Sequence, residues 1–232
     1  MEHKRLTLFA GHYGSGKTNI AVNYALHLAA EGKKVCIADL DIVNPYFRTK
    51  DSAAQLEKAG IELISPQFAN TNVDLPALPA EAYRLVQDKS VYGIMDIGGD
   101  DRGAYALGRY TPFIKEENDY RMAFVANPYR PLTRTPEDAL EVMREIEAAC
   151  SLRFTCIVNN ANLGTETTAA DVLETQAYIE KLSALSGLPL WITTAEESVA
   201  SQLVGKLQNL LPMQLQEKYF DLPEQRARPL FG

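Results

Sequence analysis

Short apolar runs alternate with amphipathic stretches along the whole chain. The apolar runs predict strands at residues 6–10, 33–39, 61–65, 91–97, 120–126, 153–159 and 188–193. The stretches between them predict helices at residues 18–30, 51–59, 81–88, 135–150, 168–185 and 197–211. Residues 102–116 are expected to be helical in part, with an interruption at Pro112. Strands that alternate with helices form parallel sheets. We therefore expect an α/β fold of three layers, in which helices cover both faces of a doubly wound, mostly parallel sheet.

Residues that start or stop a helix support these boundaries. Thr135 is expected to cap the helix that has Pro136 at its first position, and Gly32 is expected to end the first helix. Prolines at 66, 76 and 79 predict a loop at 67–79. No repeat or low-complexity segment divides the chain, so we expect one domain over residues 1–232.

The composition narrows the class of protein. The 232 residues are 46% hydrophobic and 23% charged, as in globular domains with a sizeable core. The 23 basic and 30 acidic residues give a net charge of −7, which disfavours a general nucleic-acid-binding surface. No signal peptide and no apolar run of membrane-spanning length is visible. The three cysteines form no C-x-x-C pair, and buried reduced thiols are expected. We expect a cytoplasmic protein.

Residues 11–18 read GHYGSGKT, which matches the phosphate-binding pattern G-x-x-x-x-G-K-[ST]. A predicted strand precedes the motif and a predicted helix follows it, as such a loop requires. Gly14 and Gly16 allow backbone angles that turn N–H groups inward, and the helix directs its positive end at the same point. Lys17 is expected to contact the β- and γ-phosphates, and the Thr18 hydroxyl to ligate Mg²⁺.

Aspartates and asparagines follow three other predicted strands. Because ligands bind at the carboxyl ends of strands in such sheets, these residues are candidates for the same site. Asp96 is the expected magnesium partner, and Asp41 is expected to position or activate water. The Gly99 N–H is expected where a γ-phosphate would lie. The roles of Asp39, Asp100 and Asp101 stay open.

The motifs GHYGSGKT, ADLDIVNP, DIGGDD and CIVNN together resemble the SIMIBI class of P-loop NTPases. Within that class the chain is similar to the MinD/ParA/CobQ-like group and to the nitrogenase iron protein. The resemblance implies that Asp41 serves hydrolysis, that residues 96–99 form a second switch, and that Asn159 touches the base. The residues expected to bind nucleotide are Tyr13, Gly14, Ser15, Gly16, Lys17, Thr18, Asn19, Gly99 and Asn159.

The chain departs from these relatives in two places. His12 and Tyr13 stand where the MinD/ParA group has a signature lysine and a glycine. That lysine acts across a dimer interface in the group, so a homodimer around nucleotide is left open, with Arg48 or Arg102 as a hypothetical substitute charge. No cysteine lies in the DIGGDDRG loop, so the iron protein's cluster is not expected.

The residues at 159–162 favour ATP over GTP. GTP-binding relatives use N-K-x-D, whereas this run is Asn-Asn-Ala-Asn and has neither the lysine nor the aspartate. A side-chain amide can pair with the donor and acceptor edge of adenine. We therefore expect ATP and Mg²⁺ as ligands.

Three functions are compatible with such a site. The favoured one is an ATPase that acts as a nucleotide-dependent switch on an unidentified protein partner. An alternative is a biosynthetic enzyme of the dethiobiotin-synthetase or cobyrinate-amidase type, with a small-molecule substrate. A metallocentre maturation NTPase is a second alternative, which the scattered histidines at 3, 12 and 27 argue against. Residues 213–232 are not strongly basic, so membrane tethering is disfavoured.

Overall fold

The computed structural model describes residues 2–40, 52–65, 80–99 and 101–215. The described residues form an eight-stranded sheet of order β3-β2-β4-β1-β5-β6-β7-β8. Every pairing between neighbouring strands is parallel. The strands are β1 (Leu6–Ala10), β2 (Val35–Leu40), β3 (Glu62–Ile64), β4 (Tyr92–Ile97), β5 (Tyr120–Ala126), β6 (Cys156–Asn159), β7 (Leu190–Glu196) and β8 (Leu210–Met213).

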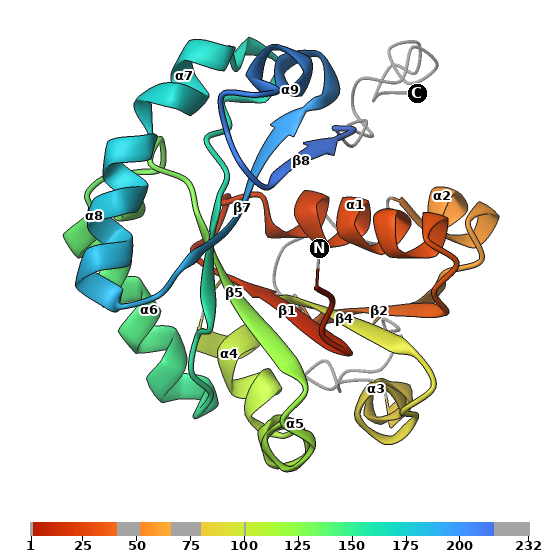
Figure 1. Ribbon diagram of the computed structural model, residues 1–232. Helices are drawn as coiled ribbons and strands as arrows, with labels where there is room; N and C mark the ends of the chain where they lie inside the picture. The colour runs from red at the N-terminus through yellow and green to blue at the C-terminus, as the bar shows by residue number, and fades with distance from the viewer. Residues whose placement is uncertain (1, 41–51, 66–79, 100, 216–232) are drawn as a thin grey trace, which may run out of the picture.

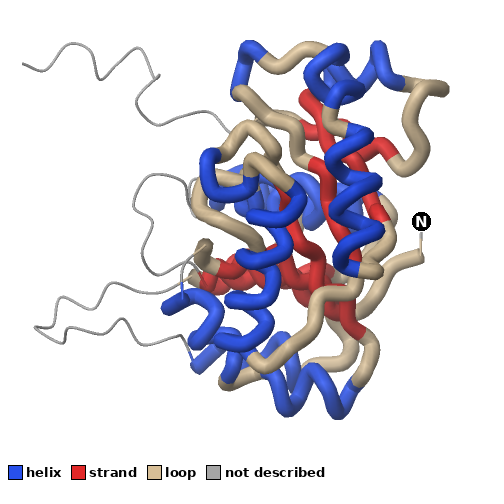
Figure 2. Tube along the Cα trace, turned by 90° about the vertical axis from the view of Figure 1, so that its left-hand side faces the viewer, coloured by secondary structure: helices blue, strands red, loops and turns tan. Residues whose placement is uncertain are grey.

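Helices connect these strands and cover both faces of the sheet (Figures 1 and 2). The α-helices are α1 (Lys17–Ala30), α2 (Ala53–Lys58), α3 (Arg84–Gln87), α4 (Asp101–Gly108), α5 (Thr111–Glu117), α6 (Pro136–Cys150), α7 (Ala169–Glu174), α8 (Gln176–Ser186) and α9 (Glu197–Leu203). The 3-10 helices are η2 (Ala80–Tyr83), η3 (Pro131–Thr133) and η4 (Gly164–Glu166). The predicted three-layer α/β fold is confirmed.

The side chains of β1 alternate between two hydrophobic clusters, one on each face of the sheet. Leu6, Leu8 and Ala10 of β1 belong to the cluster under α3, α4, α6 and α8. Phe9 points the other way, into the cluster beneath α1. Because successive side chains of a strand face opposite sides, an apolar run such as LTLFA fits a strand that is buried on both faces.

The helix predicted at residues 168–185 is divided at Thr175 into α7 and α8. The Thr175 hydroxyl donates to the Val172 carbonyl at 2.8 Å, and the Asn159 side chain donates to that hydroxyl at 3.0 Å. A threonine hydroxyl that bonds the preceding turn competes with the helix backbone and bends it. The apolar periodicity alone did not reveal this break.

The helix predicted at residues 197–211 is wrong beyond Leu203. Gly205 and Asn209 adopt left-handed backbone angles, with φ of +79° and +53°, and these end the helical path. Residues 210–213 instead form β8, which pairs with β7. A short apolar run such as LLPM is compatible with either a helix or a strand, so the pattern did not distinguish them.

Other predicted boundaries agree closely with the structure. Thr135 caps α6 through a capping box with Asp138, and Pro136 occupies the first turn, as expected. The helical stretch predicted at 102–116 is interrupted between α4 and α5, at Arg109 and Tyr110, and Pro112 lies just after this break in the first turn of α5, where its missing N–H costs nothing.

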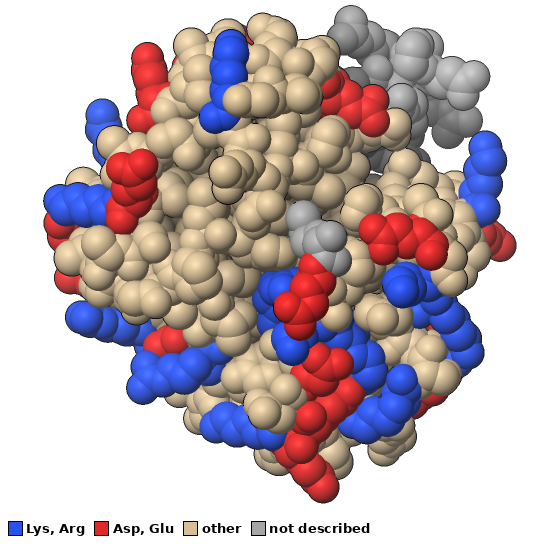
Figure 3. Space-filling model, viewed as in Figure 1, with Lys and Arg blue, Asp and Glu red and all other residues tan. Residues whose placement is uncertain are grey.

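The amino-acid composition also gave expectations about the cysteine thiols, the surface charge and membrane-spanning segments. The three cysteines are buried and unpaired, and burial raises the pKa of Cys36 to about 12 and that of Cys156 to about 11. On the face shown in Figure 3, acidic and basic side chains are interspersed. Among the described residues, no helix combines the length and apolar character needed to cross a membrane.

Candidate phosphate-binding site

The glycine-rich motif leaves the carboxyl end of β1, the strand between β4 and β5 in the sheet. Gly11, Gly14 and Gly16 have positive φ angles of 154°, 73° and 93°. A side chain at Gly11 would also meet the Val125 carbonyl oxygen, since an added Cβ lies 2.6 Å from it. The glycines therefore permit both the turn of the loop and its close packing on β5.

Lys17 begins α1 and is buried. Its Nζ donates to the His12 carbonyl at 3.1 Å, so the ammonium group of Lys17 lies across the loop that leads into the helix. The first N–H groups of any helix lack acceptors within the helix, and they carry its positive dipole end. Lys17, the half-buried Thr18 and Asn19 supply these groups here. The arrangement suits a bound phosphate.

Two carboxylates lie side by side at the carboxyl ends of neighbouring strands. Asp39 of β2 is paired in register with Asp96 of β4, and Asp96 is paired with Phe9 of β1, two residues before Gly11. Asp39 and Asp96 are only 2% and 1% exposed. Alternation places both side chains on the same face as α1.

The carboxylate and hydroxyl oxygens at this edge of the sheet are suitable ligands for Mg²⁺. Carboxylate and hydroxyl oxygens are the protein ligands that this hard cation prefers, alongside phosphate and water. Asp96 and Thr18, the predicted magnesium residues, lie on adjoining elements on the α1 face. The structure adds Asp39, whose role the sequence left open, as a second buried carboxylate beside Asp96.

Gly99 brings the loop after β4 into contact with the phosphate-binding loop. A Cβ added at Gly99 would lie 2.6 Å from the backbone nitrogen of Tyr13 and 2.8 Å from its Cα. Only a glycine permits this approach. The same loop is also packed against α4, because a Cβ added at Gly103 would lie 2.6 Å from the Cα of Gly98. The loop after β4 is therefore packed between the phosphate-binding loop and α4 at this point.

The asparagine that ends β6 and the one that follows it make different contacts. The amide of Asn159 donates to Thr175 at 3.0 Å, and the side chain is fully buried. Asn160 instead donates to the Ser15 carbonyl at 2.6 Å and accepts from the Thr194 hydroxyl at 2.7 Å. Asn160 thus ties the phosphate-binding loop to β7. Contact between Asn159 and a base stays a prediction, and it would require the bond to Thr175 to be exchanged.

Arg130 is a second residue that was not among those expected to bind nucleotide. Its Nε donates to the Gly14 carbonyl at 2.8 Å from the loop that follows β5. Asn127 shapes that loop, because its side chain accepts from the Tyr129 N–H and its carbonyl accepts from the Arg130 N–H, both at 3.1 Å. No pattern in the sequence indicated this contact, which depends on the position of β5 beside β1.

Several predicted residues lie outside the described part of the chain. Asp41, Arg48, Asp100 and the proline-containing loop at 67–79 are among them, and the side chains of Asp101 and Arg102 are likewise not described. Tyr13 and His12 are described, and Tyr13 is half exposed at the rim of the loop.

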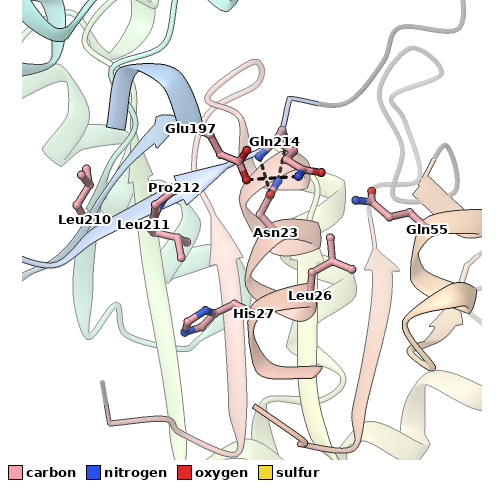
Figure 4. Close-up of a pocket in the computed structure, with 9 residues that line it drawn as sticks. All are labelled: Asn23, Leu26, His27, Gln55, Glu197, Leu210, Leu211, Pro212 and Gln214. Atoms are coloured by element: carbon pink, nitrogen blue, oxygen red, sulfur yellow. Dashed lines mark hydrogen bonds between the residues drawn. The ribbon is translucent and has the colours of Figure 1, made fainter. Parts of the chain in front are cut away.

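A separate pocket lies between α1 and β8 (Figure 4). Asn23 of α1 donates to the Gln214 carbonyl and accepts from the Gln214 N–H, both at 2.9 Å, which fastens the end of β8 to the helix. His27 lines the same pocket one turn further along α1. None of the residues predicted to bind nucleotide lines this pocket.

The sequence matches no protein-family profile, and no curated protein matches it. Solved structures do match by fold. FtsY from Thermotoga maritima superposes with a TM-score of 0.57 at 16% identity, over 84% of this chain and 63% of that one. FtsY from Mycoplasma mycoides gives 0.55 at 16% identity, over 83% and 60%.

A third structure, the signal recognition particle 54 kDa protein from Aeropyrum pernix in complex with GDP, gives a TM-score of 0.52 at 18% identity, over 81% of this chain and 40% of that one. The chain thus spans less than two thirds of the length of these structures. At such identities the likeness concerns the fold. The chain has the α/β fold of the SIMIBI-class P-loop proteins, to which these structures belong, as its motifs indicated.

Proposed function

We propose that this protein binds ATP with Mg²⁺, hydrolyses it slowly, and acts as a nucleotide-dependent switch on a protein partner. The proposal rests on the close approach of Gly99 to the Tyr13 backbone. A loop that lies against the phosphate-binding loop is positioned to respond to the presence or absence of a γ-phosphate. The packing of Gly103 on Gly98 would pass such a displacement to α4.

Within this proposal Lys17 binds the phosphates, while Thr18 and Asp96 hold the magnesium ion. Asp41 positions the attacking water, so Asp41→Ala is expected to keep nucleotide binding and lose turnover. The choice of ATP rests on the absence of a lysine and an aspartate from residues 159–162. GTP is the competing nucleotide, because two solved structures of this fold are complexes with GDP.

Hydrogen exchange tests the switch. The protein is compared with Mg²⁺ and either a non-hydrolysable ATP analogue or ADP, and backbone protection is measured across residues 96–108. A switch predicts different protection in the two states at Gly98 and Gly99 and along α4. Identical protection in both states, with nucleotide bound, would contradict the switch and favour the biosynthetic alternative.

A further inference from the structure

Two of the three histidines that are scattered in the sequence, His3 and His27, come together in the fold at the far end of α1. His3 precedes β1, and His27 lies in the last turn of α1, whose C-terminal cap is Glu31. The His3 Nε2 lies 3.0 Å from one Glu31 carboxylate oxygen, and the His27 Nε2 lies 3.2 Å from the other. The ligand atoms of the three side chains all lie within 4.8 Å of one another.

We propose that His3, His27 and Glu31 form a binding site for a divalent transition metal of the zinc type. Imidazole nitrogens and a carboxylate are ligands that zinc accepts, and two histidines with one glutamate leave a fourth position for water. Bonds of about 2 Å in a tetrahedral site separate neighbouring ligand atoms by about 3.3 Å. The observed separations of 3.0 and 3.2 Å join the two histidine nitrogens to the two different oxygens of Glu31, so one ion would take one of these oxygens as its ligand.

A buried hydroxyl orients the His3 ring. The His3 Nδ1 lies 3.0 Å from the Tyr24 hydroxyl, and Tyr24 is fully buried. When Nδ1–H donates to this oxygen, Nε2 keeps the lone pair that a metal needs, as in protein sites where a second partner fixes the ligating tautomer.

The other two groups are open to solvent. The side chains of His27 and Glu31 are 41% and 39% exposed, and His27 lines the pocket of Figure 4. An ion can therefore reach the cluster without unfolding of the core. His27 lies ten positions after Lys17 along α1, a rise of about 15 Å, so this site is separate from the phosphate-binding loop and does not depend on the proposed nucleotide function.

Zinc titration of the full chain, followed by calorimetry in excess Mg²⁺, tests the site. We expect one Zn²⁺ per chain for the wild type. His27→Gln and Glu31→Gln, at exposed positions where folding is preserved, should each weaken binding by at least about tenfold, and Tyr24→Phe by about 10-fold to 100-fold. His12→Gln is the matched control, because it removes the third histidine and should bind zinc as the wild type does.

Cobalt gives a second readout, since tetrahedral Co²⁺ with nitrogen ligands absorbs visible light strongly. The wild type and Lys17→Ala should both show this band, which separates the metal site from the phosphate site. Absence of zinc binding in the wild type would overturn the proposal and leave the cluster as a histidine–glutamate ion-pair network. Undiminished binding by His27→Gln and Glu31→Gln would overturn it equally.

Discussion

The Nε of Arg130 donates to the carbonyl oxygen of Gly14 at 2.8 Å, so an arginine from the loop after β5 rests on the phosphate-binding loop. A guanidinium has five N–H donors in a planar fork, and the bond to Gly14 uses one of them. The contact brings a positive charge to a loop in which His12 stands at the position of the signature lysine of similar proteins.

We predict that Arg130→Ala weakens binding of nucleoside triphosphate by about tenfold, through loss of a charged hydrogen-bond donor beside the phosphates. Arg130→Lys should not restore affinity, because lysine lacks the planar fork that bonds Gly14 and a phosphate together. Arg134→Ala, an exposed arginine four residues away, serves as the control. Calorimetry measures the affinities, and equal binding by Arg130→Ala and Arg134→Ala would show that Arg130 has no part in the site.

Gly99→Ala is expected to disturb the phosphate-binding loop. The new Cβ would lie 2.6 Å from a backbone nitrogen, and backbone atoms cannot yield as the end of a flexible side chain can. We expect nucleotide affinity to fall by about tenfold or more while the fold is retained. Gly108→Ala is the matched control, since its nearest neighbouring atom would lie at 3.9 Å. If both alanine variants bind nucleotide like the wild type, the close contact between the two loops is not important for binding.

Asn160→Ala should destabilise the protein by about 1–3 kcal/mol, because it leaves the Ser15 carbonyl and the buried Thr194 hydroxyl without their side-chain partner. It should weaken ATP and GTP binding by the same factor, since Asn160 holds the loop. Asn159→Ala should instead change the ratio of the two affinities, if Asn159 contacts the base. Urea unfolding and paired nucleotide titrations measure these effects, and an altered ratio in Asn160→Ala would assign base contact to Asn160.

Glu117→Gln should destabilise the protein in a pH-dependent way. Glu117 pairs with the buried guanidinium of Arg5, which also donates to the Leu85 carbonyl at 2.9 Å. Burial of Glu117 opposes its ionisation, but hydrogen bonds from Arg5 and Lys89 outweigh it and lower the pKa of this carboxyl. Loss of one partner of a buried ion pair costs about 3 kcal/mol.

The sign of the pH effect follows from the lowered pKa. The contribution of Glu117 is fully present above the unfolded-state pKa of about 4.3 and is lost as the pH falls through the lower folded-state value. Urea unfolding should therefore show a wild-type advantage over Glu117→Gln at neutral pH that shrinks below about pH 4. Glu116→Gln, its exposed neighbour on α5, should show no such advantage. An advantage that persists unchanged in acid would contradict this assignment.

The sequence predicted those parts of the fold that depend on local chemistry. Doubly buried strands such as Leu6–Ala10 and capped helices such as Pro136–Cys150 have patterns that few other structures satisfy. It failed at Leu210–Met213, where pairing with β7 decides between helix and strand. That pairing depends on which strands become neighbours in the fold, so the apolar run alone does not predict it.

The residues of the site divide in the same way, into those that the local sequence indicated and those that only the fold brings together. The phosphate-binding loop and Asp96 were predicted from contiguous motifs, in which the order of the residues largely determines the local geometry. Arg130, Asn160 and the register of Asp39 beside Asp96 depend on which strands are neighbours in the sheet. The meeting of His3 with His27 also depends on the fold, because 24 positions of chain separate them.

Calorimetric titration with ATP and GTP, in the presence and absence of Mg²⁺, is the most direct test of whether residues 11–18 bind the phosphates of a nucleotide. We predict that the wild type binds ATP more tightly than GTP, that Mg²⁺ strengthens binding, and that Lys17→Ala loses at least about tenfold in affinity, or about 1.4 kcal/mol. Failure of the wild type to bind either nucleotide, or equal binding by Lys17→Ala, would contradict this prediction.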